Sequence, residues 1–269
     1  MEKKYKLTDE TINVDGRILH RIEALKDFGD VKKGDKGGFI EKEDNLSQNG
    51  NCWIYNDAKV CSLAKVYGDA KVCGNARVSV NAEVYGNAVV LANAKVRGDA
   101  SVFGNAKIFG NAEVYANAKV YDNAMVCGNT YVYGDAEVFG NAIVYDNAVI
   151  YDNAVIYDNA KVYGDVLICG DTLVYDNARI CGNAVVYGKA RICRDAIITS
   201  DSDYIIFKNW WSSGRFFTWT RSNNMWKVGC FYGTGEQLIN KAYGDSELSG
   251  REYERVVKYV ESIIKDCPK

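Results

Sequence analysis

The richest collection of side chains able to bind a ligand lies between Tyr204 and Tyr232. This stretch holds four of the five tryptophans and four cations, and it contains no acidic residue. Arginine and lysine beside aromatic rings can grip a phosphate or stack on a planar base. Alternatively, the tryptophans form the core of a small domain and the cations are solvated, and we expect a core position for two of the four tryptophans. The residues expected to bind a small, nucleotide-like anion are Lys208, Trp210, Arg215, Trp219, Arg221, Trp226 and Lys227.

A six-residue repeat precedes these side chains and occupies more than half of the chain. Residues 58–201 repeat the unit 24 times without an insertion or a deletion. The first position is alanine in 21 units, the third is always valine or isoleucine, and the sixth is asparagine or aspartate in 22 units. The first and third side chains point to one side of a short strand, and Gly or Asp followed by Asn or Asp forms a corner. Such short strands cannot bury their inner sides alone, so the pattern predicts stacked coils of a parallel β-solenoid.

In this spacing the chain resembles the hexapeptide-repeat proteins. The resemblance implies a three-sided, left-handed parallel β-helix with three repeat units per coil, hence about eight coils, and it implies a homotrimer. Acyltransferases of that family use a histidine as general base and a loop that interrupts the coils. This repeat contains no histidine and no interruption. The segment around Phe39 also resembles the leader of bacterial and phage solenoid proteins, which are labelled acyltransferases from their fold. The segment from Gly229 to Thr234 resembles part of a small domain that recurs in phage and prophage proteins.

The remaining residues able to do chemistry have structural interpretations. The single histidine, His20, alternates with Ile18 and Ile22, which favours a strand position over a general base. Six of the nine cysteines fall in the fourth position of the repeat, and no two of these are separated by one full coil of three units, so we expect free thiols. Asp158 and Asp176 would stack, but calcium needs more oxygen ligands than two carboxylates supply. We therefore expect no catalytic residue, no metal and no cofactor.

The flanking segments lack the repeat and predict three domains. Residues 1–51 should form a hairpin with an Asp15-Gly16 turn that covers the first coil. Residues 52–201 form the solenoid, and residues 202–269 form a small α+β domain with a β-hairpin and two helices. Capping boxes predict helix starts at Thr234 and Ser249. The predicted fold class is therefore mainly β, with an N-terminal capping segment and a small C-terminal α+β domain.

One outer surface of the solenoid changes character along the chain. The face formed by every third unit, beginning with the unit at residue 58, is charged in its first three coils and apolar in its last four. Such a patch is typical of a partner surface. It could instead contact the chain's own C-terminal domain, but we favour a homo-oligomer, preferably a trimer. The expected interface residues are Tyr131, Tyr133, Val149, Tyr151, Leu167, Val185 and Tyr187.

Composition narrows the class of function. A net charge of −2 predicts neither nucleic-acid binding nor attraction to an anionic membrane. No signal sequence and no apolar run long enough to span a membrane is visible, and free thiols suit a reducing compartment, so we expect a cytoplasmic protein. These observations favour a non-enzymatic binding or scaffold protein that contacts a small anion or, as the phage resemblance implies, a host protein. The alternative is an acyl-CoA-dependent acyltransferase.

Overall fold

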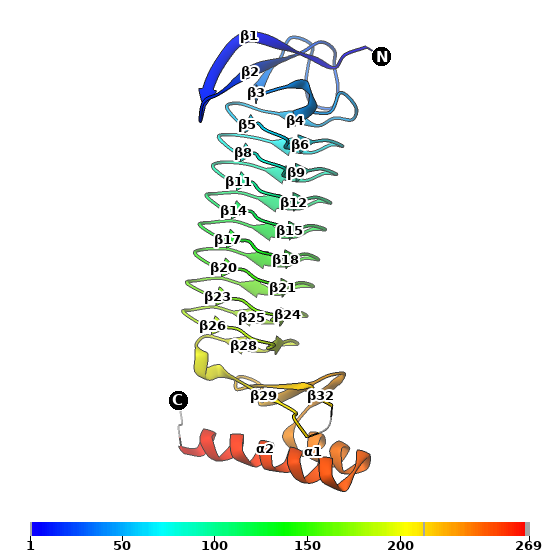
Figure 1. The fold of residues 1–269 in the computed structure, drawn as a ribbon, viewed down its shortest axis with the longest axis vertical. Helices are drawn as coiled ribbons and strands as arrows, with labels where there is room; N and C mark the ends of the chain where they lie inside the picture. The colour runs from blue at the N-terminus through cyan, green and yellow to red at the C-terminus, as the bar shows by residue number, and fades with distance from the viewer. Residues whose placement is uncertain (1, 212, 267–269) are drawn as a thin grey trace.

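The computed structural model describes residues 2–211 and 213–266, which form an elongated prism with a small domain at each end (Figure 1). Strands of two residues recur at every repeat unit and stack in three flat sheets. Each strand pairs in parallel with the strand three units later, as Val60 does with Val78. The predicted three-sided parallel β-solenoid and its coil of three units are therefore confirmed.

We name the three sheets of the solenoid as faces. Face 1 contains β5 (Lys59–Val60), β8 (Arg77–Val78), β11 (Lys95–Val96), β14 (Glu113–Val114), β17 (Tyr131–Val132), β20 (Val149–Ile150), β23 (Leu167–Ile168) and β26 (Val185–Val186). Face 2 contains β6 (Lys65–Val66), β9 (Glu83–Val84), β12 (Ser101–Val102), β15 (Lys119–Val120), β18 (Glu137–Val138), β21 (Val155–Ile156), β24 (Leu173–Val174) and β27 (Arg191–Ile192). Face 3 contains β4 (Trp53–Ile54), β7 (Lys71–Val72), β10 (Val89–Val90), β13 (Lys107–Ile108), β16 (Met125–Val126), β19 (Ile143–Val144), β22 (Lys161–Val162), β25 (Arg179–Ile180) and β28 (Ile197–Ile198). Coil 1 is residues 58–75, and coils 2 to 8 follow in steps of three units up to residue 201.

A further coil precedes coil 1, so the solenoid has about nine turns and not eight. Strand β3 (Lys36–Ile40) pairs in parallel with β5, and β4 pairs in parallel with β7. Between them Leu46 bridges Val66 in parallel. The solenoid therefore begins before residue 52, where the sequence pattern had placed its start.

The core and the corners follow the repeat. The alanines of the first position and the valines and isoleucines of the third are buried throughout. Where Thr130 and Thr172 replace alanine, each hydroxyl donates a hydrogen bond to the carbonyl three residues earlier. The asparagines of successive corners form ladders, since the amide of Asn87 donates to Asn105 at 3.1 Å, and Asn105 donates to Asn123 at 3.0 Å. Glycine is required where coils approach closely, because a Cβ on Gly98 would lie 2.8 Å from the Ala116 nitrogen.

The N-terminal segment extends face 1 and covers the open end of the core. Strands β1 (Tyr5–Val14) and β2 (Arg17–Ala24) form the predicted antiparallel hairpin, and β2 pairs in antiparallel with β3. Asp15 and Gly16 form its turn with φ of 53° and 81°, as a primed turn requires. The short helix η1 (Glu43–Asn45) follows β3. Tyr5 is buried in the same hydrophobic cluster as the coils, so the expected capping role is confirmed.

The C-terminal domain is the predicted α+β unit. Its elements are η2 (Asp201–Asp203), β29 (Tyr204–Lys208), β30 (Phe216–Thr220), β31 (Met225–Val228), β32 (Phe231–Gly233), α1 (Gly235–Asp245) and α2 (Glu247–Asp266). Helix α1 begins at the predicted capping box, where Thr234 accepts a hydrogen bond from the Gln237 nitrogen. The start predicted for α2 was wrong, because Ser246 Oγ accepts from the Ser249 nitrogen at 3.1 Å and α2 already begins at Glu247.

The sheet of this domain lies between the last coil and the two helices, and it closes the end of the solenoid (Figure 1). The last strand of each face has backbone N–H groups with no following strand. On face 2 the Arg191 N–H donates to Thr218 Oγ1 at 3.0 Å, and on face 3 the Ile197 N–H donates to Ser222 Oγ at 2.8 Å. On face 1 the Val185 N–H donates to Asp201 Oδ1 at 2.8 Å. At least one side chain per face therefore continues the hydrogen-bonding pattern where the coils end.

Candidate functional site

The expected interface residues lie together on the outer surface of face 1 in coils 5 to 8. They project outward because the third-position residues beside them fill the core. Tyr187 is 57% exposed, and Tyr131 is exposed as well. Tyr133 stacks between Tyr115 and Tyr151 at centroid distances of 4.8 and 5.2 Å. Four successive coils thus present one apolar strip, roughly 19 Å tall at about 4.8 Å per coil.

The strip ends abruptly at coil 4, where face 1 becomes charged. Glu113 accepts ion pairs from Lys95 at 2.8 Å and from Arg97 at 3.4 Å. The Arg97 guanidinium also lies 4.2 Å from the centre of the Tyr115 ring. These charges neutralise one another within face 1.

Face 2 carries a continuous aromatic column of seven rings. Neighbouring rings stack at 4.7 to 5.1 Å with interplanar angles of at most 11°. Stacked rings cover one another's faces, so the column presents edges and offers no platform on which a sugar or a base could stack. Two hydroxyls in the column donate to carboxylates, Tyr67 to Glu83 and Tyr121 to Glu137, each at 3.0 Å. We therefore interpret the column as a structural ladder.

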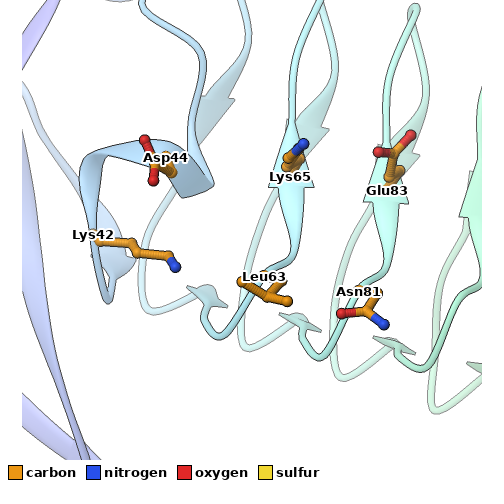
Figure 2. A pocket seen from close by; sticks show the side chains of 6 residues that line it. All are labelled: Lys42, Asp44, Leu63, Lys65, Asn81 and Glu83. Carbon is orange, nitrogen blue, oxygen red and sulfur yellow. The ribbon is translucent and has the colours of Figure 1, made fainter.

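A hollow of about 510 Å³ lies at the corner between faces 1 and 2 in the first two coils. Figure 2 shows Leu63 and Asn81 on successive corners, with Lys65 and Glu83 on the adjoining strands and Lys42 and Asp44 around η1. Leu63 replaces the usual corner amide and is 62% exposed. Val80 beside it is 47% exposed and has a φ of 66°, which is strained for a β-branched residue. The sequence already marks this corner, because Leu63 breaks the repeat.

The predicted anion site is not assembled as one site. Trp219 and Trp226 are buried between the sheet and the helices, in the cluster that contains Phe217 and Val257. Their prediction as ligand contacts is therefore wrong, since neither ring has a free surface. Trp210, in contrast, is 80% exposed.

The four cations of this region are dispersed. Arg215 and Arg221 flank opposite ends of β30, which places them roughly 20 Å apart at about 3.3 Å per residue. Lys227 lies opposite Thr218, on the side of the sheet that faces the solenoid. Lys208 is exposed at the end of β29, paired with Phe216. No arrangement of one small ligand can contact all four.

One predicted residue, Arg215, does line a hollow of about 260 Å³ in the C-terminal domain. Buried Val228 and Leu238 form its apolar side, and exposed Arg215, Lys241 and Asp245 lie at its edge. Arg215 extends over Gly229, where an added Cβ would lie 3.3 Å from its Cδ. Sequence reasoning missed Lys241, whose position one residue before the buried Ala242 on α1 was the available signal.

The remaining predicted positions have structural roles. His20 Nδ1 lies 3.1 Å from the Thr8 carbonyl oxygen, within the N-terminal hairpin. Asp158 Oδ2 accepts a hydrogen bond from the Asp176 nitrogen at 3.3 Å, so this carboxylate supports the next corner. The eight cysteines within the described ranges are free, and Cys267 lies outside them. Among residues 2–211 and 213–266, no cluster of metal-ligating side chains and no helix able to cross a membrane occurs.

Comparisons with known proteins bear on the repeat. Residues 168–188 and 178–194, in coils 7 and 8, match a family model described as the YdcK Beta solenoid repeat. The repeat is similar to that of YdcK. An Escherichia coli (strain K12) protein named "Uncharacterized acetyltransferase YdcK" is 42% identical over 62 residues, which are 20% of this chain and 19% of that protein. The chain thus covers about a fifth of the length of this relative.

Proposed function

We propose that the protein is a non-enzymatic scaffold that assembles with copies of itself through face 1. The observation that carries this proposal is the apolar strip of coils 5 to 8, where exposed Tyr131 and Tyr187 flank half-buried tyrosine, valine and leucine side chains. Flat β-sheets pack face to face at about 10 Å, and apolar area contributes about 25 cal/mol per Å² buried, which must exceed the entropic cost of association. The C-terminal domain covers the end of coil 8, and Tyr131 and Tyr187 at the two ends of the strip are exposed.

The test is a double variant, Val149→Lys with Leu167→Lys, examined by light scattering. Lysine already occupies the equivalent second position in coil 6 of face 3, as Lys161, so the variant should fold. We expect the wild type to run as a multiple of 29.9 kDa and the variant to run as a monomer. A monomeric wild type would refute the proposal.

We propose binding of a small anion at the C-terminal hollow as a second function. The observation that favours it is that two cations, Arg215 and Lys241, and one acid, Asp245, line a hollow of about 260 Å³. This volume suits a phosphate or carboxylate with a short apolar body better than a whole nucleotide. Calorimetry with phenyl phosphate tests it: Arg215→Gln should weaken binding at least tenfold, whereas Arg251→Gln, an exposed arginine of α2, should not. Equal binding by both variants would contradict the site.

An acyl-CoA-dependent acyltransferase is the alternative of another class. The name of the E. coli relative is the feature that suggests it, and that name belongs to a match over a fifth of the chain. The hollows described above combine neither a histidine with an acceptor group nor a loop that leaves the coils. The scaffold proposal rests on residues of this chain and is therefore preferred.

A further inference from the structure

The N-terminal segment contains a buried lysine that lies against a buried cysteine. Lys4, just before β1, is only 1% exposed, and Cys52, just before β4, is buried in the coil that precedes coil 1. The Lys4 Nζ atom lies 3.3 Å from Cys52 Sγ and donates to the Cys52 carbonyl at 3.0 Å. It also donates to the Gly50 carbonyl at 3.2 Å. The amine is therefore held in contact with the sulfur.

The contacts of this amine are unusual for a lysine. Its partners are the carbonyl oxygens of Asn49, Gly50 and Cys52 and the Cys52 sulfur, and none of them is a carboxylate. A buried ammonium ion without a countercharge is costly, so burial favours the neutral amine. Burial accordingly lowers the pKa of Lys4 and raises the pKa of Cys52. Both changes increase the share of molecules in which the nitrogen keeps its lone pair and can act as a base or a nucleophile.

The segment that carries Lys4 can open without unfolding the coils. Residues 2–4 lie outside the strands of the cap. The Lys4 backbone N–H donates to Gln48 Oε1 at 2.8 Å, and Lys3 pairs with Glu43 at 2.7 Å on the surface. Local opening of such segments requires less free energy than opening of the core. Because the amine touches the sulfur, its movement uncovers Cys52 to a small oxidant.

A peroxide can convert this contact into a covalent bond. Proton transfer from the Cys52 thiol to the Lys4 amine gives a thiolate, which attacks one peroxide oxygen and becomes a sulfenic acid. The departing hydroxide takes the proton from the ammonium and leaves as water. The Lys4 nitrogen then attacks the sulfur, and the hydroxyl group leaves with a nitrogen proton as a second water. Sulfur loses two electrons to the peroxide, so one thiol, one amine and one hydrogen peroxide give one sulfenamide and two waters.

We propose that Lys4 and Cys52 are an oxidative modification site, at which peroxide forms a reversible S–N cross-link that fastens the N-terminal segment to the solenoid. The distance of 3.3 Å between nitrogen and sulfur is one from which reacting atoms attack. The link closes a loop that contains β1, β2, β3 and η1, and such a closure removes freedom from the unfolded chain. Oxidation thus stabilises the cap over the open end of the coils.

The other cysteines provide internal controls. No other cysteine of the described ranges has a lysine amine within hydrogen-bonding distance. Cys230 is exposed and reports that the peroxide has reacted, whereas half-buried Cys127 reports oxidation without an amine in contact. A cross-link to lysine is therefore expected at Cys52 and not at Cys127.

Peptide mapping by mass spectrometry tests the inference on the whole, reduced protein after treatment with hydrogen peroxide. We expect a pair of peptides joined through Lys4 and Cys52, about 2 Da lighter than the two free peptides together because two hydrogens are lost. Dithiothreitol should separate them. If Cys230 is oxidised while Cys52 remains a free thiol, or becomes a sulfinic acid or a disulfide, the inference is overturned. A joined pair that retains an oxygen atom would overturn the S–N chemistry.

Two variants separate chemistry from structure. Lys4→Met keeps a long apolar stem and removes the nucleophile, so dimedone should trap Cys52 as a sulfenic acid. Lys65→Met, at an exposed lysine of coil 1, should cross-link like the wild type. Oxidation should raise the melting temperature of the wild type and of Lys65→Met but not of Lys4→Met, and reduction should reverse the rise. A cross-linked protein with an unchanged melting temperature would refute the fastening of the cap, and the map of the wild type decides the chemistry even if Lys4→Met does not fold.

Discussion

The closure of the solenoid by the C-terminal domain can be tested at a single hydroxyl. Thr218 is buried in β30, and its Oγ1 accepts the hydrogen bond from the Arg191 N–H at 3.0 Å. Thr218→Val keeps the shape of the side chain and removes this acceptor. A buried donor without a partner costs about 1–3 kcal/mol, and water can partly replace the partner here because the Arg191 side chain is exposed. We therefore expect the free energy of unfolding to fall by about 1–2 kcal/mol, in the lower half of that range.

Urea denaturation measures the stability loss, and hydrogen exchange of the Arg191 amide locates it. Exchange at this amide should accelerate in Thr218→Val, because the last strand of face 2 loses its only side-chain acceptor from β30 among the described residues. Thr218→Ser is the matched control, since it keeps the oxygen and removes a methyl group. If the valine variant is as stable as the serine variant and Arg191 remains equally protected, the domain does not close the coil in the way described.

Three further outcomes are expected. Burial raises the pKa of Tyr204 to about 12, and its hydroxyl donates to the Val185 carbonyl at 3.0 Å. The stability that the neutral Tyr204 hydroxyl contributes is full below pH 10 and should disappear as the pH rises through 12. Tyr204→Phe should not show this loss in an alkaline denaturation series. Denatured, unreduced protein should titrate with Ellman's reagent as nine free thiols, and several disulfides would contradict the separation of the cysteines along the coils. The protein should neither bind nor turn over acetyl-CoA, and His20→Ala should behave like the wild type in the same assay, because this imidazole contacts the Thr8 carbonyl within a hairpin; turnover lost in a solenoid point variant would establish the alternative function.

The coils were predictable because inner positions recur at a fixed spacing, and the missing coil shows the limit of that argument. Its inner residues are Ile40, Leu46 and Ile54, which pair with Val60, Val66 and Val72. The spacing within this coil is six residues and then eight, so a search for units of six passes over it. Backbone pairing tolerates the two extra residues because they lie in a loop between strands.

The site was less predictable, because sequence shows which side chains share a side of a strand but not what covers that side. Trp219 lies two residues from Phe217, and Trp226 lies two residues from Val228, so each pair shares one side of its strand. The two tryptophans could therefore be assigned to one surface of the sheet. That surface is buried by α1 and α2, as membership of one cluster shows. The exposed Leu63, in contrast, was visible in the sequence as a break in the repeat. Only the fold shows which corner of the next coil lies beside it and forms the hollow with it.

Because each strand pairs with the strand three units later, the number of repeat units sets both the length of the solenoid and the face on which each unit lies. Removing residues 112–129, one whole coil, would shorten the protein by about 4.8 Å and leave all three columns of side chains continuous. Removing one unit of six residues would instead turn everything beyond the cut by a third of a revolution, so that the apolar strip would continue a different face. The number of units thus sets both how far apart the two terminal domains lie and in which direction each one points.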